Sequence, residues 1–483
     1  MRLSVLYLCL LACGFLLSSF QVKENTGANT PTPPNVIFIL ADDLGYGDLG
    51  FLGQQYIETP ALDRLASQGM RFSQHYAGAP VCAPSRSTLL TGLHTGHTPI
   101  RGNFEIQPEG QYPMPDTLMT LGKIFQQAGY RTAAFGKWGL GFVGTTGDPS
   151  NQGFDHFFGY NCQRYAHRYY PAYLWENQQQ VPLPGNDWST KTTFAPDLIH
   201  QKSLEFIEAN QQQPFFLFLP LVMPHAELAV PEDETFQYYR TKFGEETPHL
   251  APPGGDYGPE MVIPGYQSQP YPRATFAAMV ARIDRYVGEI MNKLEVLGLS
   301  ENTLVVFTSD NGAHREGGAD PLFFDSNGPF RGFKRDLYEG GIHVPLVAHW
   351  PGKIKAGRQS SHVAAFWDWL PTLADAIGAA SPSGIDGISF LPTLLDAGQQ
   401  QLPDHLYWEF HESGGRQALR KGDWKLVKYQ VQDAAKTTLE LFDLAKDPAE
   451  QTNVALDYPA LVAELEGLMQ KAHRPNLVFR QLD

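Results

Sequence analysis

The sequence predicts an α/β protein in which helices flank a large, mostly parallel mixed sheet, followed by a small C-terminal α+β domain. Short apolar runs typical of buried strands, such as residues 36–40 (VIFIL), alternate with segments of helical periodicity, a pattern that indicates βα repetition and a parallel sheet. Beyond residue 395 the pattern changes to short strand-like runs and one amphipathic segment. We therefore expect one large domain over residues 35–395 and a small one over residues 396–483.

The composition indicates a globular protein with a large core. The 483 residues include 36 Lys plus Arg and 51 Asp plus Glu, a net charge of −15 that argues against a nucleic-acid binder. Apolar residues make up 42% of the chain, aromatic residues 12% and charged residues 18%. A chain so rich in apolar and aromatic residues is not typical of a disordered protein.

Residues 1–20 predict an export signal. A single Arg2 precedes an apolar run whose length fits a signal peptide better than a membrane span. The segment LLAC, ending at Cys13, loosely resembles a lipoprotein cleavage site, so a lipid anchor is the alternative to ordinary cleavage. Residues 21–34 are typical of a polar spacer, and no later run is apolar for long enough to cross a bilayer. We expect an exported protein that is periplasmic, at the cell surface or secreted.

Four predicted strands end in polar side chains of the kinds that bind metals or anions. They are Asp42 and Asp43 after residues 36–40, Lys137 after 132–135, His225 after 215–221, and Asp310 and Asn311 after 304–308. Asp and Asn often only mark turns. Ligands in open α/β sheets bind beyond the carboxyl ends of the strands, however, so four such strand ends together predict a shared site.

Periodicity also predicts the main helices. Residues 274–297 carry apolar side chains mostly at three- and four-residue steps, and Gly298 ends this core helix. Residues 116–128 predict a second helix with Asp116 as its N-cap. The elements expected in the C-terminal domain are strands at 425–429 and 438–442 and a helix at 459–473.

The segment VCAPSRSTLLTG at residues 81–92 carries the strongest chemical signal. Pro84 favours a helix start, which places Cys82 at a helix N-terminus where free N–H groups and the helix dipole favour an anion. Arg86 adds a fixed cation one turn later. We predict an oxyanion pocket around Cys82, in which the thiol pKa would be depressed. The alternatives are a buried structural cysteine and a Cys82–Cys162 disulfide, since these two cysteines remain after signal cleavage.

The chain resembles the type I sulfatases of the alkaline phosphatase superfamily, whose CxPSR signature matches CAPSR at residues 82–86. Other landmarks of that family occur in order: Asp42-Asp43 in ADDLG, Lys137 in GKW, His225 after Pro224, Asp310-Asn311 in SDNG, and Lys334 ahead of YEGG. The stretches GDWKL and ELFDL resemble the family's small domain. The likeness runs from about Asn35 to the end of the chain, and a co-linear set of this kind is far more specific than one short motif. It implies an alkaline phosphatase-like fold and sulfatase activity.

The resemblance implies a modified nucleophile. Cys82 would be oxidised after translation to formylglycine (3-oxoalanine) by a formylglycine-generating enzyme, and would then not be available for a disulfide. The aldehyde hydrates to a geminal diol, one oxygen of which attacks sulfur and forms a covalent sulfate ester. The second hydroxyl then loses its proton and expels sulfate while the aldehyde re-forms.

The resemblance also implies a bound cation. Three carboxylates, Asp42, Asp43 and Asp310, would converge where an anionic substrate binds, so a divalent ion is needed to balance their charge. Oxygen ligands favour a hard ion, and family precedent favours one Ca²⁺ over Mg²⁺. The implied ligands are Asp42, Asp43, Asp310, Asn311 and the modified Cys82.

The remaining implied roles are cationic binding of sulfate and proton transfer. Arg86, Lys137 and Lys334 would neutralise sulfate charge, and His225 would protonate or orient the leaving oxygen. Two positions depart from the family pattern: Gly139 replaces the usual histidine of GKWH, and Leu93 replaces an arginine after LTG. His167, in an aromatic stretch, is our candidate substitute for the missing histidine, and packing among the aromatic rings is the alternative.

Export, aromatic content and family habit together favour a sulfated carbohydrate substrate over another sulfated small molecule. A cluster at the start of the C-terminal domain would either line the substrate entrance or form an interdomain seam; it consists of Trp408, Glu409, His411, Glu412 and Arg416. A phosphomonoester or phosphonate hydrolase of the same superfamily is the first alternative function. A non-catalytic binder of sulfated glycans is the second.

Overall fold

The computed structural model describes residues 33–107, 109–186, 190–251, 266–480 and 482. From Pro33 onward the chain forms one compact unit. The predicted signal peptide at residues 1–20 and nearly all of the spacer lie outside the described residues. Within the described part of the chain, no helix combines the length and the apolar character that a bilayer span requires.

A mixed sheet of ten strands forms the centre of the described chain, in the order β13-β2-β12-β11-β1-β10-β6-β7-β8-β9. Its strands are β1 (Asn35–Asp42), β2 (Met70–Phe72), β6 (Arg131–Lys137), β7 (His156–Tyr160), β8 (Tyr173–Glu176), β9 (Gln179–Pro182), β10 (Phe215–Pro224), β11 (Thr303–Ser309), β12 (Leu346–His349) and β13 (Arg358–Ser360). The strands from β11 to β7 run parallel, and antiparallel pairs follow on both sides. This arrangement confirms the predicted fold class.

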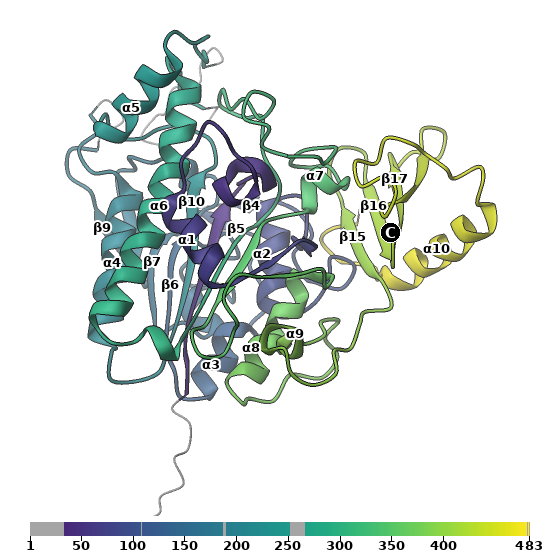
Figure 1. The fold of residues 1–483 in the computed structure, drawn as a ribbon, viewed down its shortest axis with the longest axis horizontal. Coiled ribbons are helices and arrows are strands. Elements are labelled where there is room, and N and C mark those ends of the chain that lie inside the picture. The colour runs from purple at the N-terminus through teal and green to yellow at the C-terminus, as the bar shows by residue number, and fades with distance from the viewer. Residues whose placement is uncertain (1–32, 108, 187–189, 252–265, 481, 483) are drawn as a thin grey trace, which may run out of the picture. The chain divides into compact units, whose positions relative to one another are not determined.

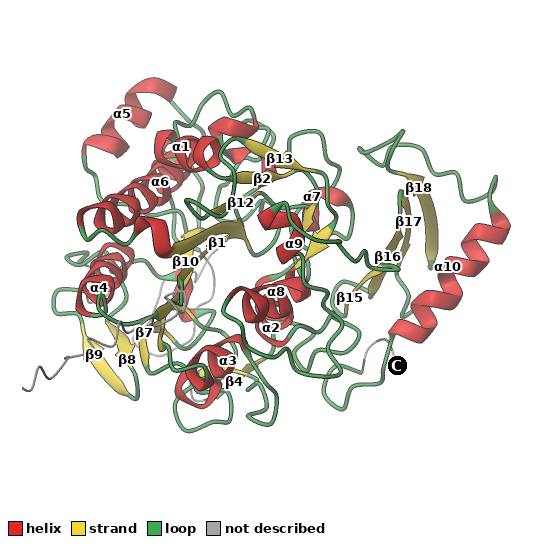
Figure 2. Ribbon diagram, turned by 60° about the horizontal axis from the view of Figure 1, so that its bottom comes forward, coloured by secondary structure: helices red, strands yellow, loops and turns green. Residues whose placement is uncertain are grey.

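The central strand β1 is buried along its whole length, and its side chains alternate between two apolar layers. Ile37 and Ile39 belong to one layer, and Val36 and Phe38 to the other. Helices α1 (Pro60–Gln68), α4 (Ala195–Ala209) and α6 (Pro272–Val296) cover the first layer; α2 (Cys82–Thr91), α3 (Leu121–Gln127) and α8 (Trp369–Ala376) cover the second. Figures 1 and 2 show the two groups of helices on opposite faces of the sheet. A strand buried on both faces needs apolar residues at every position, which explains the continuous run VIFIL.

The long helix α6 lies within two residues of its predicted bounds, whereas α3 begins five residues later than predicted. Thr120 has an extended backbone, and its hydroxyl accepts a hydrogen bond from the N–H of Lys123 at 3.5 Å. Thr120 is therefore the N-cap, in place of Asp116. An extended residue at position 120 stops the helix from continuing toward Asp116.

The C-terminal domain is an antiparallel sheet of β15 (Leu406–Phe410), β16 (Arg416–Lys421), β17 (Trp424–Tyr429) and β18 (Thr438–Asp443). Helix α10 (Pro459–Ala472) covers one face, where Leu465 and Met469 pack on Tyr407 and Leu426. The other face packs through Trp408 against the large domain. Figure 2 shows this sheet between α10 and the rest of the molecule. This sheet and α10 confirm the small C-terminal α+β part of the predicted fold class.

Short elements complete the described fold. They are β3 (His75–Tyr76) paired with β14 (Ala364–Ala365), β4 (Glu105–Ile106) paired with β5 (Gly110–Gln111), and the helices α5 (Glu234–Phe243), α7 (Glu339–Ile342) and α9 (Leu391–Leu395).

Candidate active site

The candidate site lies at the carboxyl ends of the central parallel strands. Asp42 ends β1, and Asp43 follows it with a positive φ of 64°. Asp310 follows the neighbouring β11, and its backbone N–H bonds the carbonyl of Ala41 at 3.0 Å. The carboxylate of Asp310 in turn accepts the backbone N–H of Asp43 at 3.0 Å. Adjacent strands in parallel register therefore bring three carboxylates into one buried group.

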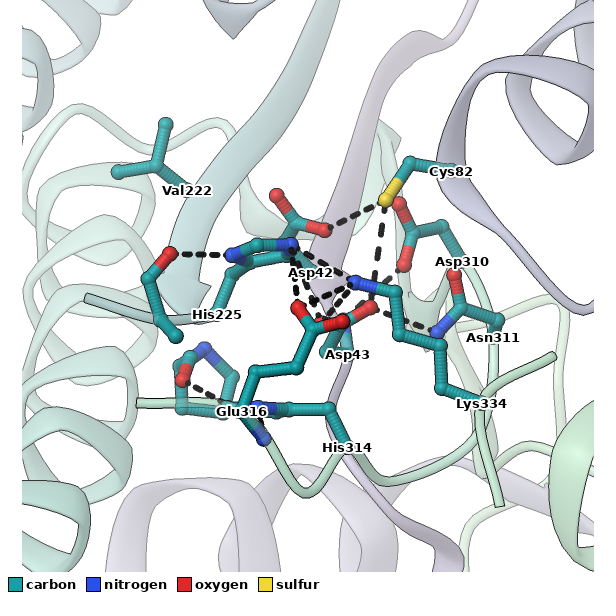
Figure 3. Close-up of polar contacts among 12 residues, drawn as sticks. Asp42, Asp43, Cys82, Val222, His225, Asp310, Asn311, His314, Glu316 and Lys334 are labelled. Atoms are coloured by element: carbon teal, nitrogen blue, oxygen red, sulfur yellow. Dashed lines mark hydrogen bonds and ion pairs between the residues drawn. The ribbon is translucent and has the colours of Figure 1, made fainter. Parts of the chain in front are cut away.

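Cys82 reaches this group from the N-terminus of α2. Val81 is extended and the helix begins at Cys82, so Pro84 occupies the third helical position, one of those whose N–H has no intrahelical partner. We expected Pro84 at the first position. The sulfur of Cys82 lies 3.3 Å from Asp42 Oδ1 and 3.9 Å from Asp43 Oδ1. Figure 3 draws both contacts as dashed lines.

Arg86 and Lys137 neutralise one side of the carboxylate group. Arg86 donates to Asp310 Oδ2 through Nη2 at 2.9 Å and through Nε at 3.1 Å. Lys137, at the end of β6, donates to Asp42 Oδ2 at 2.6 Å, and its carbonyl oxygen accepts a hydrogen bond from Arg86. All four side chains are buried. The guanidinium group of Arg86, on α2, therefore connects this helix to the end of strand β6.

Lys334 and His225 complete the other side (Figure 3). The ammonium group of Lys334 lies 2.7 Å from Asp43 Oδ2, 2.8 Å from His225 Nε2 and 3.3 Å from Glu316 Oε2. His225 Nε2 is also 3.3 Å from Asp43 Oδ2. Burial opposes ionisation of Glu316, but Lys334 and His225 outweigh it and lower the pKa of this carboxyl. Sequence reasoning missed Glu316, although its position five residues after Asn311 in a loop leaving β11 was a usable signal.

Burial governs protonation in the site. Burial and the charge of Asp42 raise the pKa of Asp310 to about 7. Burial also opposes ionisation of Asp42, but Lys137 and the other cations outweigh it and lower the pKa of Asp42. Burial and the charge of Asp42 raise the pKa of the Cys82 thiol well above its ordinary range. Our expectation of a depressed thiol pKa is therefore wrong, because dehydration and nearby carboxylates outweigh the helix N-terminus.

The donor set fits a hard divalent cation. Asp42, Asp43, Cys82 and His225 offer ligand atoms that all lie within 4.8 Å of one another. Asn311 donates through Nδ2 to Asp43 Oδ1 at 2.7 Å, which leaves its buried Oδ1 without a hydrogen-bond partner among the described residues. A buried amide oxygen beside several carboxylates is a ligand group that Ca²⁺ or Mg²⁺ accepts.

The structure thus brings together all nine residues that the sequence analysis placed in the site: Asp42, Asp43, Cys82, Arg86, Lys137, His225, Asp310, Asn311 and Lys334. Cys82 and Cys162 are both free and buried, so the disulfide alternative is wrong. His167 stacks on His225 with ring centroids 4.2 Å apart. The side chain against Gly139 is Gln163, whose Oε1 would lie 2.8 Å from a Cβ at that position.

Trp408 and Glu409, two members of the cluster at the start of the C-terminal domain, lie in an interdomain seam. Trp408 and Glu409 are fully buried. The indole of Trp408 donates to the carbonyl of Ala77 at 2.9 Å, and Arg101 donates to Glu409 at 2.8 Å. Burial and contacts of this kind match the seam alternative, so Trp408 and Glu409 do not line the substrate entrance.

A buried group of carboxylates, cations and one cysteine at the carboxyl edge of an α/β sheet is typical of hydrolases that act on anionic esters. The family model for Sulfatase matches residues 34–379, and that for the N-sulphoglucosamine sulphohydrolase C-terminal region matches residues 328–474. The chain therefore belongs to the sulfatase family. As a member of that family it is a sulfuric ester hydrolase.

Individual relatives support this assignment. The N-acetylgalactosamine-6-sulfatase of Canis lupus familiaris is 33% identical, over 79% of this chain and 69% of that protein. The N-acetylgalactosamine-6-O-sulfatase of Bacteroides thetaiotaomicron is 28% identical, over 93% of this chain and 95% of that protein. The crystal structure of Ps i-CgsB has a TM-score of 0.74 at 27% identity and covers 94% of both chains.

Proposed function

We propose that the protein is an exported, calcium-dependent sulfatase that removes sulfate from sulfated carbohydrates, with a formylglycine derived from Cys82 as the reacting group. The observation that carries the proposal is the position of Cys82 at the N-terminus of α2, in contact with Asp42 and Asp43. Fixed cations surround this position, as binding of an anionic ester requires.

The raised pKa of the Cys82 thiol supports modification. A protonated thiol among carboxylates is a poor nucleophile, whereas hydrated formylglycine supplies one hydroxyl to accept the sulfuryl group and a second whose deprotonation expels sulfate. Cys82 has no exposed surface in the folded chain. Its conversion by a formylglycine-generating enzyme must therefore precede folding.

Different side chains around residue 82 would bind the sulfate group and handle the proton of the leaving alcohol. Lys137 and Arg86 face the carboxylates on the β6 side, and Lys334 faces them on the opposite side, so a sulfate held between them meets positive charge from two directions. His225 Nε2 lies 2.8 Å from Lys334 Nζ and points into the same space. His225 Nδ1 lies against the carbonyl oxygen of Ala226, so in the neutral ring Nε2 accepts from the Lys334 ammonium. His225 would therefore orient the oxygen of the departing alcohol, or protonate it with a proton taken from Lys334.

The ligands for Ca²⁺ would be carboxylate oxygens of Asp42, Asp43 and Asp310, the free amide oxygen of Asn311, and an oxygen of the modified residue 82. The cation would supply positive charge next to a sulfate oxygen. It would also offset the burial and the repulsion from Asp42 that raise the pKa of Asp310 to about 7.

The choice of a carbohydrate substrate rests on the relatives. Two of them are N-acetylgalactosamine 6-sulfatases, and Ps i-CgsB has been crystallised with a neocarrahexaose. The export proposal rests on the leader at residues 1–20 and places the protein in the periplasm, at the cell surface or outside the cell. A lipid anchor on Cys13 stays the alternative to ordinary cleavage.

The test combines turnover with a mass measurement. The chain is co-expressed with a formylglycine-generating enzyme, and sulfate release is followed from an aryl sulfate and from 6-sulfated N-acetylgalactosamine, with the aryl phosphate as comparison. The tryptic peptide of residues 72–86 is weighed in the same preparation. We expect replacement of the thiol sulfur by an aldehyde oxygen, and sulfate turnover above phosphate turnover.

Cys82→Ala should abolish turnover, while Cys162→Ala, which alters the other buried free cysteine, should retain it. An unaltered thiol at position 82 in fully active protein would contradict the formylglycine proposal. Preferred turnover of the phosphate would favour the phosphomonoesterase alternative.

A further inference from the structure

Gly139 and its neighbour Gln163 differ from the arrangement that the sulfatase signature GKWH implies. Gly139 has a φ of +73°, and a Cβ placed on it would lie 2.8 Å from Gln163 Oε1. The N–H of Gly139 bonds the carbonyl of Asn161 at 3.2 Å, which holds the two segments side by side. The carboxamide of Gln163 therefore occupies space that a side chain at position 139 would need.

Gln163 is linked to the start of the nucleophile helix through Asn103. Asn103 Oδ1 accepts the backbone N–H of Ala83, the residue after Cys82, at 3.2 Å. The same oxygen accepts Gln163 Nε2 at 2.8 Å. Asn103 is itself held from the C-terminal domain, because Glu412 Oε1 accepts its backbone N–H at 3.2 Å. Residues far apart in the chain thus meet at the first turn of α2.

This network determines the orientation of the Gln163 amide. The N–H of Ala83 can only donate, so the atom of Asn103 that faces it must be the oxygen. The atom of Gln163 that faces Asn103 Oδ1 must be a donor, so it is Nε2. Gln163 Oε1 is then the atom left over, and it is buried without a hydrogen-bond partner among the described residues. A buried, unpaired acceptor is costly, and it is satisfied if a ligand or a modified side chain brings a hydroxyl group to it.

We propose that Gln163, supported by Asn103, is a positioning residue that accepts a hydrogen bond from a hydroxyl of the hydrated formylglycine at position 82. This inference rests on the proposed function, because an unmodified cysteine offers no such hydroxyl. An amide accepts a hydrogen bond but does not take up the proton. Gln163 therefore orients the remaining hydroxyl of the sulfate ester. As its O–H bond breaks, that electron pair forms the aldehyde C=O bond, the bond from Cβ to the sulfate oxygen breaks with its electron pair going to sulfate, and the hydroxyl proton passes to solvent.

The test uses Gln163→Met, which keeps the length of the side chain and removes the amide. The matched control is Gln152→Met. Gln152 is also buried with an unpaired Oε1, but its Nε2 donates to the carbonyls of Thr146 and Pro115, away from Asn103. Both variants are co-expressed with the maturation enzyme, and the peptide of residues 72–86 is weighed to measure conversion of Cys82.

Two readouts separate positioning from folding. We expect Gln163→Met to lower kcat about 10- to 100-fold, with KM changed less than about twofold, as for a misplaced reacting group. We also expect faster labelling of residue 82 by methoxyamine without substrate, because this reagent reacts with the free aldehyde and the hydrate loses its acceptor. Gln152→Met should match the parent in both readouts. Asn103→Ala, which removes the support without altering residue 163, should change both in the same direction as Gln163→Met.

Parental kcat and labelling rate in Gln163→Met and Asn103→Ala, with Cys82 fully converted, would overturn the positioning role alone. An increase in KM at unchanged kcat would overturn it too, since Gln163 would then contact substrate. Equal loss in Gln152→Met would show a general packing effect. An unmodified thiol in the active parent would overturn the proposed function and this inference together.

Discussion

The buried carboxylate of Glu409 joins the C-terminal sheet to the large domain, and its removal should measurably destabilise the protein. Glu409 lies on β15 and is fully buried. Its oxygens contact four polar side chains at 2.8 to 2.9 Å: Arg101, Tyr407, His411 and His473. Arg101 lies 308 residues earlier in the chain, so this contact links the two domains directly.

The expected loss in the free energy of unfolding follows from the pKa of the Glu409 carboxyl. Burial opposes ionisation of Glu409, but hydrogen bonds from His411 and His473 and the charge of Arg101 lower its pKa from 4.5 to about 2. At ~1.4 kcal/mol for each pH unit, this difference corresponds to roughly 3 kcal/mol. Since the folded-state pKa lies below the unfolded value, this stabilisation is present above pH 4.5 and is lost as the pH falls toward about 2.

The perturbation is Glu409→Gln, which keeps the shape and removes the charge. At pH 7 we expect the free energy of unfolding to fall by roughly 3 kcal/mol, measured by urea denaturation. For a chain of this length the melting temperature should fall by about 3 °C. The control is Glu464→Gln, because Glu464 forms an exposed ion pair with Lys421 at 2.7 Å and should change stability by less than about 1 kcal/mol. If Glu409→Gln were as stable at pH 7 as Glu464→Gln, the reasoning from the pKa of Glu409 would be refuted.

Three further predictions concern the active site. Lys334→Ala should lower kcat/KM about 10²- to 10³-fold, because it removes a preorganised cation beside the sulfate position; the exposed Lys353→Ala is the control, and equal activity of the two variants would contradict this role. Asn311→Ala should raise the Ca²⁺ concentration needed for thermal stabilisation, measured by calorimetry without substrate, and an unchanged calcium titration would show that Asn311 is not a ligand. Treatment with EDTA should abolish sulfate release and added Ca²⁺ should restore it, whereas full activity in EDTA would rule out a required cation.

Local pattern in the sequence was enough to predict the core strands of the large sheet and the six polar residues that follow them, whereas Lys334 was placed in the site only by the resemblance to sulfatases. The run VIFIL can only be satisfied by burial on both faces, and parallel strands align their carboxyl ends. The polar residues that follow each run, such as Asp42 and Asp310, therefore had to meet. The same logic of short-range periodicity located α6 within two residues of its bounds.

Features that depend on distant contacts were decided by the tertiary structure. The pKa of the Cys82 thiol is raised, whereas the helix dipole alone predicted that it would be lowered. Burial and the nearby carboxylates raise it, and both come from tertiary packing that no local segment encodes. The contact of Gln163 with Gly139 and that of Arg101 with Glu409 could not be predicted for a related reason. In each pair the two residues lie far apart in the sequence, so no local segment contains both. Sequence patterns and the family resemblance indicated which residues form the candidate site, whereas burial and long-range packing determined their charge state and their neighbours.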